Sequence, residues 1–185
     1  MALKATIYKA NVQLADMDRQ IYGDHGLTIA RHPSETDERM MIRLLAHALN
    51  APADTDHGAL EFAKDLWDTD EPALWQKDLT EQIVQWIDVG QPDEKRLLRA
   101  SPRAEHVRVY SFTASTPIWW AGIATKVTRA ANLVVWQVPA EQSQALAGLA
   151  QRTMQLQVTV QDGHVWVGDG AQSVEITPRK LYGAD

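Results

Sequence analysis

The segment from residue 82 to residue 90 constrains the fold more than any other part of the chain. In an extended conformation its apolar side chains fall on both faces of the strand, with Ile83, Ile87 and Val89 on one face and Val84 and Trp86 on the other. A strand with two apolar faces must be covered on both sides, as in the middle of a parallel or mixed sheet. The sequence therefore predicts a central strand with helices packed on both faces of its sheet.

The segments after this strand alternate between helix and strand. A helix is predicted from Pro92 to about residue 100, and the further predicted segments are strands at 106–112 and 133–138 and helices at 117–130 and 140–149. Such alternation is typical of a mixed sheet with helices on its faces. The expected fold class is therefore α/β (α+β).

Hairpins are predicted at both ends of the chain. Residues 4–14 and 21–31 form the first, and residues 156–161 and 164–167 form the second around the turn dipeptide Asp162-Gly163. Residues 174–177 add a possible third strand. Between these ends, a helix capped by Ser34 is expected to run to about residue 49, followed by a short strand at 60–63.

Length and composition favour one globular domain over residues 1–185, with an ordinary content of apolar residues. The chain has no cysteine, which excludes disulfides, thiolate zinc sites and cysteine nucleophiles. The first nine residues have no long apolar core or small-residue cleavage site, and no other run approaches about 18 apolar residues, so we expect neither a secretory leader nor a membrane span. We therefore expect a cytoplasmic protein with no membrane partner.

The charge is distributed unevenly along the chain. Residues 51–90 carry ten acidic residues against two lysines, whereas residues 91–130 carry seven cationic residues against three acids. Such a pair of segments suits a cation site beside a phosphate site, although both also fit ordinary solvated surfaces. The formal net charge of -6 argues against tight, unspecific binding to nucleic acid.

Three carboxylates form the candidate site. Asp88 shares a face of the central strand with Trp86, where a carboxylate needs a hydrogen bond, an ion pair or a cation. Glu38 lies on the apolar side of the first helix, as a ligand, as the partner of Arg31, or close enough to the helix start to reach water. Asp78 precedes the central strand, and considered alone it is better explained as a turn residue than as a ligand.

Lys95 is the fourth candidate. It falls in the first turns of the helix after the central strand, from where its side chain could reach back over the carboxylates, although such a lysine is more often a surface residue. Gln91, at the same corner, could cap the helix or contact a ligand.

Several long motifs resemble those of one known family. They are Met1 to Lys9, Ala30 to Met41, Trp75 to Leu79 and Trp86 to Arg96, and together they resemble the YaeQ family of small bacterial proteins. The resemblance spans essentially the whole chain. It implies a variant of the PD-(D/E)XK nuclease fold, in which a mixed sheet flanked by helices presents acids and a lysine to magnesium and DNA. The added N-terminal hairpin and C-terminal hairpin would extend that core.

The resemblance also implies roles for the candidate residues. Glu38, Asp78 and Asp88 match the acidic positions of the nuclease pattern, whereas Gly90 stands where its lysine is expected. Lys95 or Gln91 would have to replace that lysine. The leading hypothesis is a phosphodiesterase of nuclease type in which the three acids bind Mg²⁺ or Mn²⁺ and Lys95 helps to place the nucleophile. The alternative is an inactive nuclease-fold protein that binds a nucleic acid or a transcription-related protein.

Overall fold

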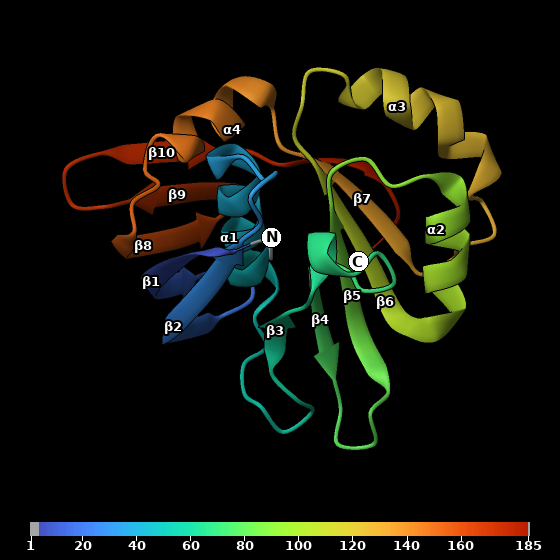
Figure 1. The fold of residues 1–185 in the computed structure, drawn as a ribbon, viewed down its shortest axis with the longest axis horizontal. Helices are drawn as coiled ribbons and strands as arrows, with labels where there is room; N and C mark the ends of the chain where they lie inside the picture. The colour runs from blue at the N-terminus through green and yellow to red at the C-terminus, as the bar shows by residue number, and fades with distance from the viewer. Residues whose placement is uncertain (1–3, 185) are drawn as a thin grey trace.

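Two β-sheets enclose one helix in the computed structural model, which describes residues 4–184 (Figure 1). Residues 1–3 of the motif from Met1 to Lys9, and residue 185 of the expected domain, lie outside the described residues. The two sheets replace the one central sheet expected from the sequence. The difference arises because the two terminal hairpins join each other rather than extending the sheet that contains the central strand.

The five-stranded sheet is built from the two ends of the chain. Its strands are β1 (Thr6–Asp16), β2 (Ile21–Arg31), β8 (Thr153–Gln161), β9 (His164–Gly168) and β10 (Ser173–Ile176), in the order β10-β9-β8-β1-β2. β1 pairs in parallel with β8, while the other neighbours are antiparallel. Both predicted hairpins are therefore confirmed, and the parallel pairing joins them.

The six-stranded sheet contains the predicted central strand. Its strands are β3 (Leu60–Phe62), β4 (Leu74–Lys77), β5 (Ile83–Val89), β6 (Ala104–Ser111), β7 (Leu133–Gln137) and β11 (Arg179–Tyr182), in the order β11-β7-β6-β5-β4-β3. β5, β6 and β7 are parallel, and the remaining pairs are antiparallel. β11 was not predicted from the sequence; it is a short edge strand whose pairing with β7 depends on contacts distant in the chain.

The helices cover both faces of the six-stranded sheet. α1 (Asp37–Asn50) lies between the two sheets, and α2 (Glu94–Ala100) and α3 (Thr116–Ile123) lie on the outer face of the six-stranded sheet (Figure 1). α4 (Ala140–Ala147) packs beside α1 and β10. Short 3₁₀ turns are formed by Asp65–Trp67, Ser101–Arg103 and Ala124–Lys126. α3 is shorter than the predicted helix at 117–130.

α1 is buried nearly all round because it touches both sheets. Its apolar side chains from Met40 to Ala48 belong to the core cluster that also contains β1, β5 and β8 residues. The polar residues Arg43, His47 and Asn50 of the same helix are also buried, and each has a hydrogen-bond partner. Thr36, rather than the predicted Ser34, caps it by accepting a hydrogen bond from the Arg39 backbone. Similarly, Asp93 caps α2, so that Pro92 lies just outside the helix.

The two faces of β5 contact different layers, as its sequence predicted. Ile87 and Val89 pack in the core cluster that contains α1, whereas Trp86 packs with Leu97 and Ala100 of α2. No helix within residues 4–184 is long and apolar enough to cross a membrane.

Candidate functional site

Asp88 forms an ion pair with α2. Its carboxylate is buried, with the residue 4% exposed, and it accepts hydrogen bonds from Nε and Nη2 of Arg96 at 2.9 and 3.0 Å. Arg96 also donates to the backbone carbonyls of Thr69 and Glu71. Burial lowers the pKa of Arg96, but the hydrogen bond and charge of Asp88, together with the charges of Asp65 and Asp93, outweigh burial and raise that pKa overall. The buried carboxylate therefore has its partner within the protein.

Glu38 belongs to the opposite face of the sheet from Asp88. It lies in the first turn of α1, which packs against the Ile87 and Val89 face of β5, while Asp88 points toward α2. The neighbouring Arg39 donates to the carbonyl of Val89. The expected partner Arg31 pairs instead with Asp37, at 2.6 Å. Glu38 and Arg96, the partner of Asp88, thus belong to helices on opposite faces of the six-stranded sheet.

Asp78 lies in the turn that joins β4 to β5. Its Oδ1 accepts hydrogen bonds from Thr80 N at 2.8 Å, Thr80 Oγ1 at 2.6 Å and Gln82 N at 3.0 Å. The Thr80 hydroxyl is the largest cause of a pKa below the ordinary value of this carboxyl group. A strand rises about 3.3 Å per residue, which puts Asp88 about 16 Å along β5 from Ile83, the first residue after this turn. Asp78 and Asp88 are therefore at opposite ends of the strand.

Asp78 therefore does not join Asp88 at one cation, whereas roles for Glu38, Asp88 and Lys95 at the carboxyl end of β5 stay a prediction. Within residues 4–184, no group of three or more histidine, aspartate or glutamate side chains is placed to hold a metal ion. Lys95 is exposed on α2. Gln91 donates from Nε2 to Thr113 Oγ1 and Ser115 Oγ, both at 2.8 Å. The element that carries each of these residues was predicted correctly, but the length of β5 keeps Asp78 apart from Asp88.

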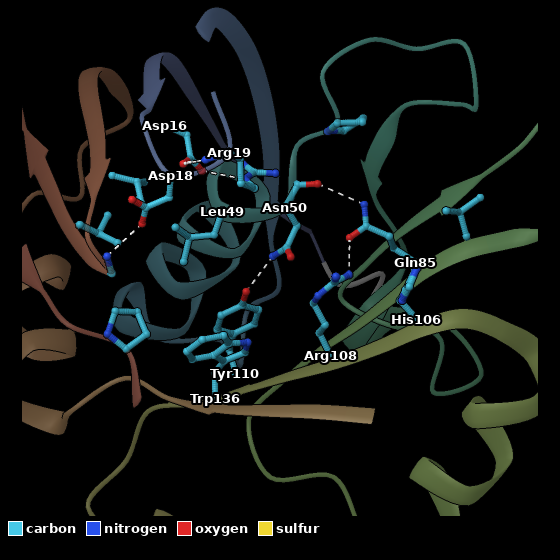
Figure 2. A pocket seen from close by; sticks show the side chains of 16 residues that line it. Asp16, Asp18, Arg19, Leu49, Asn50, Gln85, His106, Arg108, Tyr110 and Trp136 are labelled. Carbon is cyan, nitrogen blue, oxygen red and sulfur yellow. Dashed lines mark hydrogen bonds and ion pairs between the residues drawn. The ribbon is translucent and has the colours of Figure 1, made fainter. Parts of the chain in front are cut away.

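A different site is formed by a cleft of about 540 Å³ between the two sheets (Figure 2). One side is formed by β5, β6 and β7, with Gln85, His106, Arg108, Tyr110 and Trp136. The other side contains the C-terminal end of α1, the β1–β2 turn and the β8–β9 turn. The volume falls in the range of about 300–1,000 Å³ that is typical of small-molecule sites.

A chain of amide groups positions Arg108 at this cleft. Gln76 Nε2 donates to the carbonyls of His57 and Gly58, at 3.1 and 3.2 Å. Because carbonyls only accept, the other end of that amide, Oε1, faces β5 and accepts from Gln85 Nε2 at 2.7 Å. Gln85 Oε1 then accepts from Arg108 Nη1 at 2.8 Å (Figure 2). The order of donors and acceptors across three strands fixes where the guanidinium lies.

Aromatic side chains continue the same face of the sheet. Tyr110 and Trp136 are cross-strand neighbours on β6 and β7. Asn50 Nδ2 donates to the Tyr110 hydroxyl at 2.8 Å and to the Ala46 carbonyl at 2.7 Å, which ties the ring to the end of α1. The Lys180 ammonium lies 5.2 Å from the centre of the Trp136 ring. The β6–β7–β11 side therefore combines cations with aromatic surfaces.

The acids on the other side of the cleft hold turns in place. Asp16 pairs with Arg19 at 2.6 Å, and Arg19 donates onward to the Ala48 and Ala51 carbonyls at the end of α1. Asp18 accepts from the backbone N–H groups of residues 162 and 163, at 2.7 and 2.9 Å. These carboxylates therefore have structural partners, and they connect the two hairpins with α1.

The residues of the cleft were missed as a group, although the sequence carried a signal for them. His106, Arg108 and Tyr110 alternate along a predicted strand and so share one face. Gln85 stands in a mostly apolar strand, where a buried amide needs partners. The local sequence does not predict that α1 and the terminal hairpins cover the sheet face that carries Gln85, Arg108 and Tyr110.

The fold and the cleft define a mixed α+β protein in which two sheets enclose a helix and leave a cleft lined by polar and aromatic side chains. The chain belongs to the YaeQ protein family, whose model matches residues 1–178. Uncharacterized YaeQ proteins from Escherichia coli K12 and Salmonella typhi are 43% and 44% identical to it over 177 residues, with 95% of this chain and of the Escherichia coli protein covered.

Two solved structures share the fold. The YaeQ protein from Xanthomonas axonopodis pv. citri has a TM-score of 0.91 at 42% identity, covering 97% of this chain and 99% of the other. The YaeQ protein from Pseudomonas syringae has a TM-score of 0.90 at 36% identity, covering 97% of each. Both the expected family and the mixed α+β fold class are thereby confirmed.

Proposed function

We propose that this protein binds a small anionic ligand of the nucleotide class in the cleft between its sheets. The observation that carries the proposal is the Arg108 guanidinium, positioned by the Gln76–Gln85 amide chain on the same sheet face as Tyr110 and Trp136. The ligand is either a free nucleotide or the unpaired end of a nucleic acid. A binding role of this kind develops the alternative that the sequence left open.

The chemistry of the cleft matches the two parts of such a ligand. A guanidinium forms strong, charge-assisted hydrogen bonds with phosphate oxygens. Aromatic side chains such as Trp136 stabilise a base by stacking or by apolar contact. Lys180, beside Trp136, adds a second cation on this side. The net charge of -6 disfavours long nucleic acids, so the ligand is expected to be about one or two nucleotides in size.

Ligand titrations followed by NMR test this proposal. AMP and UMP are added to ¹⁵N-labelled protein, with adenosine, inorganic phosphate and a four-residue oligodeoxythymidine as separate arms. We expect a saturable shift of the Trp136 indole signal with the nucleotides. Arg108→Gln is expected to weaken that binding about 10- to 150-fold, which corresponds to the loss of one charge-assisted contact of about 1.5–3 kcal/mol.

Controls separate loss of ligand contacts from loss of structure. Trp136→Leu assigns the indole signal, and Arg129→Gln, at an exposed position of the turn after α3, is the matched charge control. Saturation by the oligonucleotide but not by AMP would identify a chain end as the source. The proposal is refuted if no nucleotide saturates the Trp136 signal, or if Arg108→Gln binds as tightly as Arg129→Gln.

The competing proposal is the PD-(D/E)XK phosphodiesterase that uses Mg²⁺ or Mn²⁺. The observation in its favour is the buried Asp88 carboxylate at the carboxyl end of β5. Glu38, Asp78 and Asp88 do not fit a single cation, however, so the geometry supports no catalytic step through a metal held by these three residues. Calorimetric titration with each metal, repeated on Asp88→Asn, tests it. Heat that disappears in the variant, together with cleavage of DNA or RNA, would favour this competitor.

A further inference from the structure

A second pocket lies on the outer face of the six-stranded sheet. It has a volume of about 210 Å³ and is lined by Trp86 of β5, by Arg96, Arg99 and Arg103 of α2 and the following turn, and by Asp70 and Asp93. Trp86 and Gln85 are consecutive on β5, so their side chains point to opposite faces of the sheet. The pocket is therefore separate from the cleft between the sheets.

Trp86 presents a buried donor that has no acceptor. The residue is 2% exposed, and its indole Nε1 has no hydrogen-bond partner among residues 4–184. The indole N–H can only donate. A buried donor without an acceptor is unfavourable, and such groups in folded proteins are normally satisfied by protein, water or ligand atoms. The missing partner of Trp86 is thus an acceptor atom.

Two arginines at the same pocket have no partner carboxylate in the described part of the chain. Arg99 and Arg103 are exposed, and neither forms a hydrogen bond or an ion pair with any residue from 4 to 184. The Arg103 guanidinium lies 5.1 Å from the centre of the Trp86 ring. The Arg96 guanidinium lies 5.7 Å from the centre of that ring, and it already donates hydrogen bonds to Asp88 and to two backbone carbonyls.

The two acids of the pocket restrict where an anion can lie. Asp93 accepts a hydrogen bond from the Arg96 backbone at 2.8 Å as the cap of α2, and Asp70 is exposed. Both carboxylates repel an anion beside them. The favourable end of the pocket is therefore the one that contains Arg99, Arg103 and the Trp86 indole.

We propose that this end of the pocket binds a phosphate-class oxyanion, with Arg99 and Arg103 as its cationic donors and the Trp86 indole N–H as a third donor. Guanidinium groups match the geometry of phosphate oxygens, and the oxyanion supplies the acceptor that the indole lacks. The ligand is either inorganic phosphate or the phosphate group of a monoester. This site is independent of the nucleotide cleft.

The test follows the Trp86 indole signal in ¹⁵N-labelled protein. Sodium phosphate, glycerol 3-phosphate, sodium acetate and sodium chloride are titrated separately at constant ionic strength. Trp86→Phe assigns the signal by removing the N–H while keeping an aromatic ring. We expect saturable shifts with phosphate or glycerol 3-phosphate, no saturation with chloride, and at least tenfold weaker binding in the double variant Arg99→Gln/Arg103→Gln.

Exposed Arg179 of β11 provides the matched control, because Arg179→Gln makes the same charge change away from the pocket. Tighter binding of glycerol 3-phosphate than of phosphate would identify a monoester as the ligand. Equal shifts with chloride or acetate, or unchanged affinity in the double variant, would overturn the proposal. Because the cleft is monitored through Trp136 and this pocket through Trp86, failure at one site leaves the other result intact.

Discussion

Replacing Asp88 by Asn distinguishes a structural ion pair from a metal ligand. The carboxylate side chain is 6% exposed, and its partner Arg96 is 29% exposed. Asn keeps the size and one acceptor oxygen of Asp, but it removes the charge. The Arg96 guanidinium then stays partly buried without its counterion, while its contacts with the Thr69 and Glu71 carbonyls remain.

The expected loss is about 2–3 kcal/mol in the free energy of unfolding. Removing one partner of a fully buried ion pair costs about 3–5 kcal/mol, and the partial exposure of Arg96 reduces that figure. For a chain of this size, such a loss lowers the melting temperature by about 5–10 °C. A cluster of uncompensated carboxylates predicts the opposite sign, because Asn would relieve repulsion in metal-free buffer.

Urea denaturation at pH 7 in buffer containing EDTA measures this change. Asp70→Asn, which removes a carboxylate from an exposed position near α2, is the matched control and is expected to leave stability within about 0.5 kcal/mol. A double-mutant cycle with Arg96→Met then isolates the coupling between the two side chains. The ion-pair interpretation is refuted if Asp88→Asn is as stable as the unmodified protein or more stable.

Two further predictions concern pH. Burial, followed by the charge of His25, lowers the pKa of His47 to about 4. As pH drops from about 6.5 to 4, only the unfolded chain gains a proton on this imidazole, so the free energy of unfolding should fall. The expected loss of stability is at most about 3 kcal/mol. Urea titrations at pH 7 and 4.5 should show a smaller loss in His47→Gln than in the unmodified protein. An equal loss in the two proteins would contradict this prediction. The Asp78 pKa lies below its ordinary value, chiefly through the Thr80 hydroxyl, so its stabilising effect is present above the unfolded pKa and is lost as pH falls through the folded pKa. Thr80→Val should raise the Asp78 pKa, which is measured by carboxyl ¹³C NMR. Thr153→Val is the control at an exposed threonine. An unchanged Asp78 pKa in Thr80→Val would show that the Thr80 hydroxyl does not lower it.

The sequence predicted local elements well where periodicity was strong. The two faces of β5, the terminal hairpins and the parallel order of β5, β6 and β7 follow from apolar patterns and turn residues. Helix caps were displaced by a few residues, because Thr36 and Asp93 compete with nearby capping or helix-starting residues. The edge strand β11 gave little local signal, since its pairing with β7 comes from a distant part of the chain.

The sequence by itself determined the family, the mixed fold class and the face of β5 on which Asp88 lies, because these depend on long motifs and on the two-residue period of a strand. Only the tertiary structure decided which layer covers each face. It put α1 with Glu38 on one side of the sheet and Arg96 against Asp88 on the other. It also closed α1 and the hairpins over Arg108 to form the cleft. Periodicity fixes the direction of a side chain within its own element, but the path of the chain between elements decides what that side chain meets.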